Sequence, residues 1–150
     1  MRLDRALWRK LTLAACTAWA LSAIFSTAAG AQETYLVLNG LTYHSNTAAG
    51  FNEHNFGLGL AHRDGPCGAE AGFYKNSFSA TSVYGLAFCE TDGHIRTGVW
   101  ASLASNYPFA DNTYGVTPFA GVQVAIGQLV IRATNANGLV LFAHVRVPLR

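Results

Sequence analysis

Several features are missing from this sequence after its first 31 residues. No apolar run reaches the ~20 residues that a membrane-spanning helix needs, so a helical membrane protein is excluded. Basic residues do not cluster. Six of the ten lysines and arginines lie in this part, against seven of the eight acidic residues, so we expect no nucleic-acid partner. Its two cysteines and scattered histidines have no metal-ligand spacing, and we expect neither a metal nor another cofactor.

The first 31 residues have the pattern of a secretory signal peptide. A basic segment from Arg2 to Lys10 precedes an apolar run from Leu11 to Phe25, and Ala29-Gly30-Ala31 is a small-x-small cleavage site. The alternative is a membrane anchor, but the apolar run is too short for a spanning helix. We therefore predict cleavage after Ala31, with residues 32–150 forming a single domain.

The remaining sequence is typical of eight short strands whose connections alternate between long and short. The expected strands are Tyr35–His44, Asn55–His62, Cys67–Lys75, Ser82–Glu90, His94–Leu103, Val116–Ile126, Leu129–Thr134 and Leu139–Val147. Barrels of the bacterial outer membrane have an even number of antiparallel strands, short periplasmic turns and longer outer loops. The sequence therefore predicts an all-β fold, an eight-stranded antiparallel up-and-down outer-membrane β-barrel.

Side chains along these strands divide into an apolar face and a face of glycine, alanine and isolated charge. The apolar sets lie within Phe56–Leu60, Tyr84–Phe88 and Leu139–Val147, while Arg132 and Arg146 lie on the other face. We expect the large apolar sets to contact lipid and the small and charged residues to line a narrow, closed lumen. Gly57 and Gly59 belong to that lumen face, near the outer rim. The alternative is a small secreted sandwich with its apolar faces inward.

Two features depart from the usual barrel pattern. The last expected strand is followed by Pro148-Leu149-Arg150 rather than ending on an aromatic residue. Pro118 lies inside the sixth expected strand, so we expect that strand to start after Pro118 or to contain a bulge.

Two cysteines, Cys67 and Cys89, bracket the third and fourth strands almost symmetrically about Phe78. Folding these strands as a hairpin places the cysteines opposite each other at the periplasmic end. The compartment is oxidising, so we predict a disulfide. Adjacent-strand bridges require favourable local geometry, and the alternative is two free thiols.

Chemically versatile side chains occur where the long connections are expected. His44 ends the first strand, and Asn76 and Ser77 follow the third, so the topology brings them to the same outer rim. A histidine beside a serine is the minimal arrangement for activating a hydroxyl, and an asparagine can orient the imidazole. The alternative is that these are solvated turn residues without a chemical role.

The rim segments share motifs with one family. Thr42-Tyr43-His44 matches a Thr-Trp-His at the end of that family's first strand. Phe51-Asn52-Glu53 and, two residues later, Phe56-Gly57-Leu58-Gly59 match its Tyr-Asn-Glu and Trp-Gly-x-Gly. Lys75-Asn76-Ser77-Phe78 matches its Lys-Asp-Ser-Trp after the third strand. In these motifs and their order, the chain resembles the lipid A palmitoyltransferases of the PagP type.

The resemblance implies a monomeric barrel in the bacterial outer membrane that transfers an acyl chain from a phospholipid to lipid A. Its partners would then be outer-membrane lipids. The essential histidine and serine of the family map onto His44 and Ser77. The essential aspartate maps onto Asn76, which can position an imidazole but carries no charge.

Three functions remain open from the sequence. The first is a lipid acyltransferase or lipid hydrolase that uses His44 and Ser77. The second is a non-enzymatic barrel in which Asn52, Glu53 and His44 hold the loops together. The third is a soluble secreted binding module.

Overall fold

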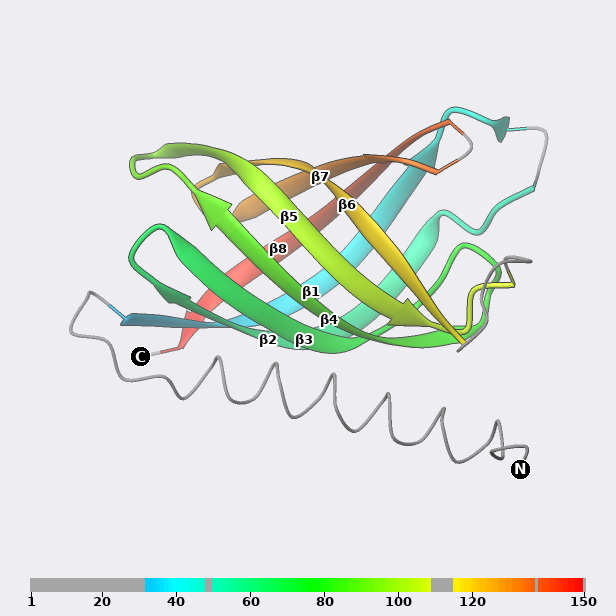
Figure 1. The fold of residues 1–150 in the computed structure, drawn as a ribbon, viewed down its shortest axis with the longest axis horizontal. Coiled ribbons are helices and arrows are strands. Elements are labelled where there is room, and N and C mark those ends of the chain that lie inside the picture. The colour runs from blue at the N-terminus through cyan, green and yellow to red at the C-terminus, as the bar shows by residue number, and fades with distance from the viewer. Residues whose placement is uncertain (1–31, 48–49, 109–114, 137, 150) are drawn as a thin grey trace, which may run out of the picture.

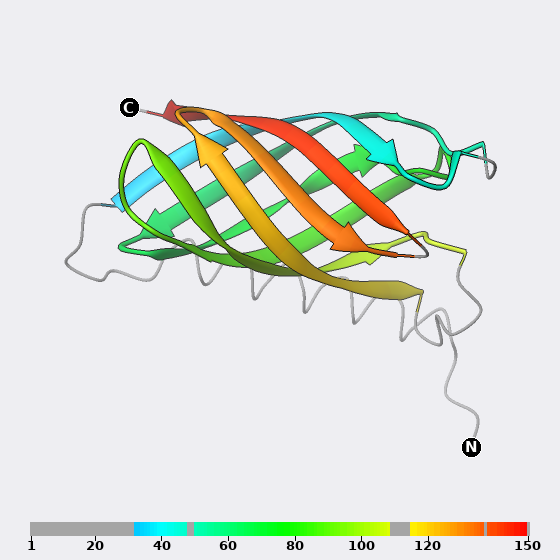
Figure 2. The same ribbon diagram turned by 90° about the horizontal axis from the view of Figure 1, so that it is seen from above.

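The computed structural model describes residues 32–47, 50–108, 115–136 and 138–149. The expected signal peptide and its cleavage site at Ala31 lie outside these ranges. The described residues form a closed barrel in which each strand is antiparallel to its chain neighbours and β1 also pairs with β8 (Figures 1 and 2). The strands are β1 (Gln32–His44), β2 (His54–Asp64), β3 (Cys67–Lys75), β4 (Thr81–Glu90), β5 (Ile95–Ser105), β6 (Val116–Ile126), β7 (Leu129–Asn135) and β8 (Leu139–Leu149).

The predicted eight-stranded antiparallel barrel is confirmed. The tight turns β2–β3, β4–β5 and β6–β7 lie at one end of the barrel, on the left in Figure 1. We call this the turn end. The connections β1–β2, β3–β4, β5–β6 and β7–β8 lie at the opposite end, which we call the loop end. Closure gives every strand a partner on both sides over at least part of its length, which is how a barrel satisfies most of its backbone hydrogen-bonding groups. Within the described ranges we find no long apolar helix of the kind that crosses a membrane.

Most large apolar side chains point outward, as predicted. Phe56 on β2 is 63% exposed and Val99 on β5 is 60% exposed, and Leu58, Leu60 and Leu139 are also exposed. The opposite face is buried in the lumen and carries polar and charged side chains: Glu70, Glu90, Gln123, Arg132, His144 and Arg146. In a soluble barrel the large apolar side chains would form the core, whereas here they cover the outer surface. That arrangement is compatible with a lipid bilayer.

Strand β4 is the exception, and there the predicted orientation is wrong. Tyr84, Leu86 and Phe88 point into the lumen, where they are almost fully buried, while Val83 faces outward. Both faces of β4 are apolar, so alternation alone did not identify the inner one. Glycine and alanine on neighbouring strands leave space inside the barrel, and the large β4 side chains fill it.

Charged side chains fill the turn half of the lumen. Glu70 accepts hydrogen bonds from Arg132 Nη1 at 3.0 Å, from Arg132 Nη2 at 2.7 Å and from Tyr84 Oη at 2.9 Å. Glu90 accepts from Arg96 Nε at 2.8 Å. Arg146 connects the two carboxylates, because its Nη2 lies 3.6 Å from Glu70 and its Nη1 lies 3.3 Å from Glu90. We call Glu70, Glu90, Arg96, Arg132 and Arg146 the ion cluster.

Removing one charge from this cluster should destabilise the barrel more than removing a pair. Glu70→Leu leaves Arg132 buried without its carboxylate, and we expect a loss of about 3–5 kcal/mol. The double variant Glu70→Leu/Arg132→Met removes both charges and should lose less. Urea unfolding of protein refolded into lipid vesicles measures the difference.

The matched control is Asp92, which pairs with Arg63 and whose own side chain is 86% exposed. Asp92→Ala should change stability by no more than about 1 kcal/mol. A loss in Glu70→Leu as small as that in Asp92→Ala would contradict a structural role for the ion cluster.

Gly59 on β2 tests the assignment of faces. A Cβ added at Gly59 would lie 2.7 Å from Tyr84 Oη and 2.8 Å from the Ala71 carbonyl oxygen, so the lumen has no room for it. Gly59→Leu should destabilise the barrel by about 1–3 kcal/mol or more, while Leu58→Ile on the outer face should be nearly neutral. The folded fraction on unboiled gels measures both. Equal tolerance at the two positions would mean that the faces are reversed.

Candidate active site at the loop end of the barrel

His44 and Ser77 meet at the loop end, as the topology predicted. His44 is the last residue of β1, and Ser77 lies in the β3–β4 connection. Ser77 Oγ and His44 Nε2 are hydrogen-bonded at 2.8 Å, and both residues are buried. A serine hydroxyl in contact with an imidazole nitrogen is the geometry that general-base activation of a nucleophile requires.

Aromatic packing holds His44 in place. The Phe51 ring lies 4.6 Å from the His44 ring, centroid to centroid, and Phe51 in turn makes an edge contact with Phe78 at 5.4 Å. The other ring nitrogen, His44 Nδ1, is buried and has no hydrogen-bond partner in the described part of the chain. Within the described part of the chain, the imidazole is therefore oriented by packing on one side and by Ser77 on the other, with no third polar residue bonded to it.

Asn76 does not orient His44, and the role expected from the sequence is wrong. Its Oδ1 accepts from the backbone N–H groups of Phe78 and Ala80, and its Nδ2 donates to Ser82 Oγ and the Asn106 carbonyl. The side chain is fully buried, and these bonds use its oxygen within the turn and its nitrogen on β4 and the β5–β6 connection. Asparagine is suited to this role because its amide can bond the backbone of its own turn.

Asn52 and Glu53 connect the β1–β2 loop to its surroundings. The Asn52 N–H donates to the Ser77 carbonyl at 2.8 Å, and Asn52 Nδ2 donates to the Asn76 carbonyl at 3.2 Å. The Glu53 carbonyl accepts from the Thr42 N–H at 2.9 Å. These bonds fix the Ser77 turn against the loop that follows His44, which preserves the distance between the two reactive atoms.

The His44–Ser77 pair borders an apolar pocket. Its walls are made by Phe51, Phe78, Tyr107, Phe119, Val140 and Phe142 together with smaller residues. Phe119 and Phe142 also line a second cavity deeper in the barrel, which reaches Arg132 of the ion cluster. Reactive atoms at the mouth of an apolar cavity suit a substrate with a hydrocarbon chain.

Sequence reasoning missed the aromatic wall of the deeper cavity, which Tyr74, Tyr84 and Trp100 form with Phe119 and Phe142. The Tyr74 and Tyr107 hydroxyls are hydrogen-bonded at 2.8 Å across the lumen. Alternation in the sequence placed Tyr84 on the lipid-facing side and gave the other residues no face. Alternation along one strand shows which residues share a face, but only the neighbouring strands show which face is inside.

An opening lies between β6 and β7 near the site. The pairing of these strands reaches only Gly121 and Thr134, and the residues of β6 before Gly121 have no β7 register partner. A surface pocket occupies this place, lined by residues 117–120 and 134–136. Pro118 is part of β6 and pairs in register with Leu103 of β5, so the expected late start or bulge is wrong. A proline is tolerated there because β7 does not continue alongside it.

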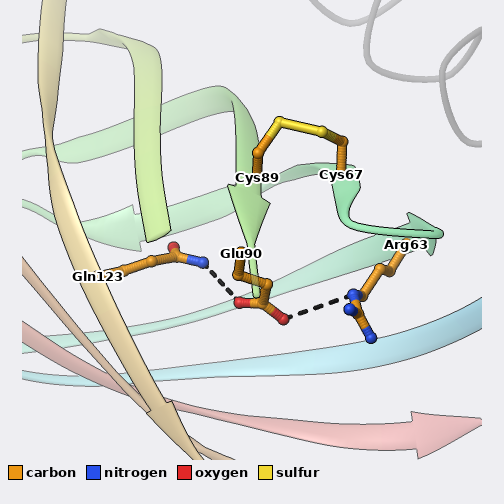
Figure 3. Close-up of a disulfide and its surroundings, with 5 residues drawn as sticks. All are labelled: Arg63, Cys67, Cys89, Glu90 and Gln123. Atoms are coloured by element: carbon orange, nitrogen blue, oxygen red, sulfur yellow. Dashed lines mark hydrogen bonds and ion pairs between the residues drawn. A yellow bond between two sulfur atoms is a disulfide. The ribbon is translucent and has the colours of Figure 1, made fainter. Parts of the chain in front are cut away.

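The predicted disulfide is present at the turn end, far from the site. Cys67 and Cys89 are directly opposite each other on β3 and β4 and are joined by their sulfur atoms. Figure 3 shows the bridge on one side of β4 and the Glu90 carboxylate on the other, where Gln123 donates to it at 2.7 Å and Arg63 lies 3.7 Å away. The bridge therefore constrains the strand that supplies Glu90 to the ion cluster.

No metal site is visible, since the described residues contain no group of three or more histidine, cysteine, aspartate or glutamate side chains that could hold an ion. Comparison with known proteins finds no match, either among family models or among curated proteins. The class defined by fold and site is thus a closed eight-stranded barrel with a buried His–Ser pair at its loop end.

Proposed function

We propose that this chain is a barrel of the bacterial outer membrane that transfers acyl chains between lipids, with Ser77 and His44 as its reactive pair. The observation that carries the proposal is the 2.8 Å hydrogen bond between Ser77 Oγ and His44 Nε2 at the edge of an apolar pocket. The resemblance to the lipid A palmitoyltransferases supports a phospholipid as donor and lipid A as acceptor.

The outer surface of the barrel supports the location. Large apolar side chains cover it on successive strands, while the charged residues of the ion cluster are inside. A surface of this kind is stable in a bilayer and unfavourable in water. The signal-peptide pattern of residues 1–31 supports export, and the long connections would then face the cell exterior.

The pair can transfer an acyl chain in two balanced steps. In the first, His44 Nε2 takes the proton of Ser77 Oγ as that oxygen attacks the ester carbonyl. The ester C–O bond breaks, the proton passes to the leaving oxygen, and the acyl chain is joined to Ser77. In the second, a hydroxyl of the acceptor lipid gives its proton to His44 Nε2 and attacks the acyl carbonyl. The bond between Ser77 Oγ and the acyl carbon breaks, and His44 returns the proton to Ser77 Oγ.

The described part of the site lacks two features that make such pairs fast. Among the described residues none is hydrogen-bonded to His44 Nδ1, so the imidazolium formed in each step has no carboxylate in direct contact, and the charge of Glu53 acts on it only from a distance. The backbone N–H groups of Phe78, Ser79 and Ala80 all donate to Asn76, so this turn offers none of them to a developing oxyanion. We therefore expect slower turnover than a complete triad gives.

These absences favour a second candidate, a non-enzymatic barrel of the same architecture. In this alternative the Ser77–His44 bond joins the β3–β4 turn to β1, as the Asn52 bonds join it to the β1–β2 loop. A lipid hydrolase would use the same pair as the transferase, with water in place of the acceptor hydroxyl.

The location is tested by fractionation. We expect the processed chain in the outer membrane and a band that migrates faster unboiled than boiled, because a closed barrel resists detergent until heated. Recovery in the soluble periplasm without detergent would contradict the proposed location.

The chemistry is tested by mass spectrometry of lipid A and phospholipids from a host that lacks its own lipid A palmitoyltransferase. Wild-type protein should add an acyl chain to lipid A. Ser77→Ala and His44→Ala should each lower the product about 100-fold or more, with the heat-modifiable band retained. Ser45→Ala, which changes a neighbouring exposed hydroxyl, should have no effect.

Asn76→Asp separates the structural role of Asn76 from the catalytic role assigned by resemblance. The structure implies a loss of folded protein, because a carboxylate cannot donate to Ser82 Oγ and the Asn106 carbonyl. Increased acyl transfer in this variant would restore the triad interpretation. Unchanged lipids with wild-type protein would instead favour the non-enzymatic barrel, and free fatty acid without modified lipid A would favour the hydrolase.

A further inference from the structure

The deeper cavity has walls of two kinds. Tyr74, Tyr84, Trp100, Phe119 and Phe142 form an aromatic wall. The neighbouring strands β2, β1 and β8 contribute a wall that contains Asn55, Thr42 and His144. Polar side chains beside a bound hydrocarbon would lose their contact with water and gain no hydrogen-bond partner. The polar wall therefore indicates a ligand that is not purely hydrocarbon.

Three polar atoms of that wall are unpartnered. Thr42 Oγ1, Asn55 Oδ1 and His144 Nε2 are buried and make no hydrogen bond in the described part of the chain. Their residues are 3%, 4% and 3% exposed, respectively. All three residues line the same cavity, so their unpartnered atoms lie beside one binding space.

The bonds that these residues do make define what the molecule must offer. Asn55 Nδ2 donates to the Lys75 carbonyl at 2.6 Å, which fixes the amide and leaves Oδ1 as a pure acceptor. His144 Nε2 lies 3.9 Å from Glu70 Oε2, too far for a hydrogen bond. Asn55 therefore requires a donor, whereas the Thr42 hydroxyl can donate or accept.

We propose that this cavity binds an acyl chain that carries a hydroxyl group, and that Thr42, Asn55 and His144 select for that group. An unsubstituted chain would cover the three polar atoms and remove them from water without giving them a partner, which is unfavourable. A hydroxyl on the chain can donate to Asn55 Oδ1 and, at the same time, accept a hydrogen bond from the Thr42 hydroxyl. The aromatic wall packs against the hydrocarbon on either side.

The cavity is placed to hold the chain of a substrate bound at Ser77. It shares Phe119 and Phe142 with the pocket at the His44–Ser77 pair. Thr42 precedes His44 by two residues on the same face of β1, a rise of about 7 Å. The hydroxyl would therefore lie in the middle of the chain, several carbons from the ester. This proposal depends on the proposed function only for the source of the chain, an ester of a membrane lipid.

Trp100 provides the measurement, because it lines the cavity and is the only tryptophan after residue 31. Ser77→Ala protein, processed and folded in detergent, is titrated with dodecanoic acid and with the same acid carrying a mid-chain hydroxyl. Trp100 fluorescence reports binding of the chain without any turnover. We expect the hydroxylated acid to bind about fivefold or more tightly, as one additional hydrogen bond gives.

Two variants test the selecting residues. In the Ser77→Ala background, Thr42→Val keeps the shape of the side chain and removes its hydroxyl, and Asn55→Leu removes the acceptor. Each should abolish or reverse the preference, and Thr42→Val alone decides if Asn55→Leu does not fold. Ser102→Ala changes a cavity residue outside the β2–β1–β8 wall and should leave the preference intact.

Equal or weaker binding of the hydroxylated acid would overturn the proposal, as would a preference that persists in Thr42→Val. Absence of any fluorescence response to either acid would also overturn it. These outcomes are independent of catalysis, because the titration uses the Ser77→Ala variant, which lacks the reactive hydroxyl. Selective binding combined with unchanged lipids would retain the cavity assignment and reject the acyltransferase.

Discussion

The ion cluster inside the barrel is the interaction on which the rest of the structure depends. Eight strands enclose a lumen that side chains must fill, and here Glu70 and Glu90 fill it together with Arg96, Arg132 and Arg146. Buried charges are tolerated only when they are paired, so the positions of β3, β4, β5, β7 and β8 are tied to one another. With charge held inside, the large apolar side chains remain for the outer surface.

The lumen is divided by this arrangement into halves with different properties. The turn half is closed by the ion cluster and constrained by the disulfide of β3 and β4. The loop half has aromatic walls, two cavities that share Phe119 and Phe142 as lining residues, and the Ser77–His44 pair. The ion cluster therefore fills the lumen beneath the cavities, and Arg132 of the cluster lines the deeper one.

Particular residues show how far sequence reasoning reached. Strand number and order followed from alternating connections, and the meeting of His44 and Ser77 followed from topology, because both depend on chain direction alone. The inner face of β4 was misassigned, since Tyr84, Leu86 and Phe88 alternate with residues that are also apolar. Asn76 was assigned to His44 from its place beside Ser77 and then by resemblance, whereas hydrogen bonds within its own turn fix its side-chain oxygen elsewhere. Pro118 was expected to disturb β6, but the shortness of β7 removes the conflict.

The sequence by itself determined the strands, their order and the end of the barrel at which each connection lies, because these depend on local alternation and on chain direction. It also determined that Cys67 and Cys89 are opposite each other, since they are equally spaced about one turn. Only the tertiary structure decided which side chains share the lumen. Glu70 meets Arg132 and Arg146 across strands distant in sequence, and Thr42, Asn55 and His144 reach one cavity. Those contacts depend on how the barrel closes and on the register between strands, and neither can be deduced from the sequence of one strand.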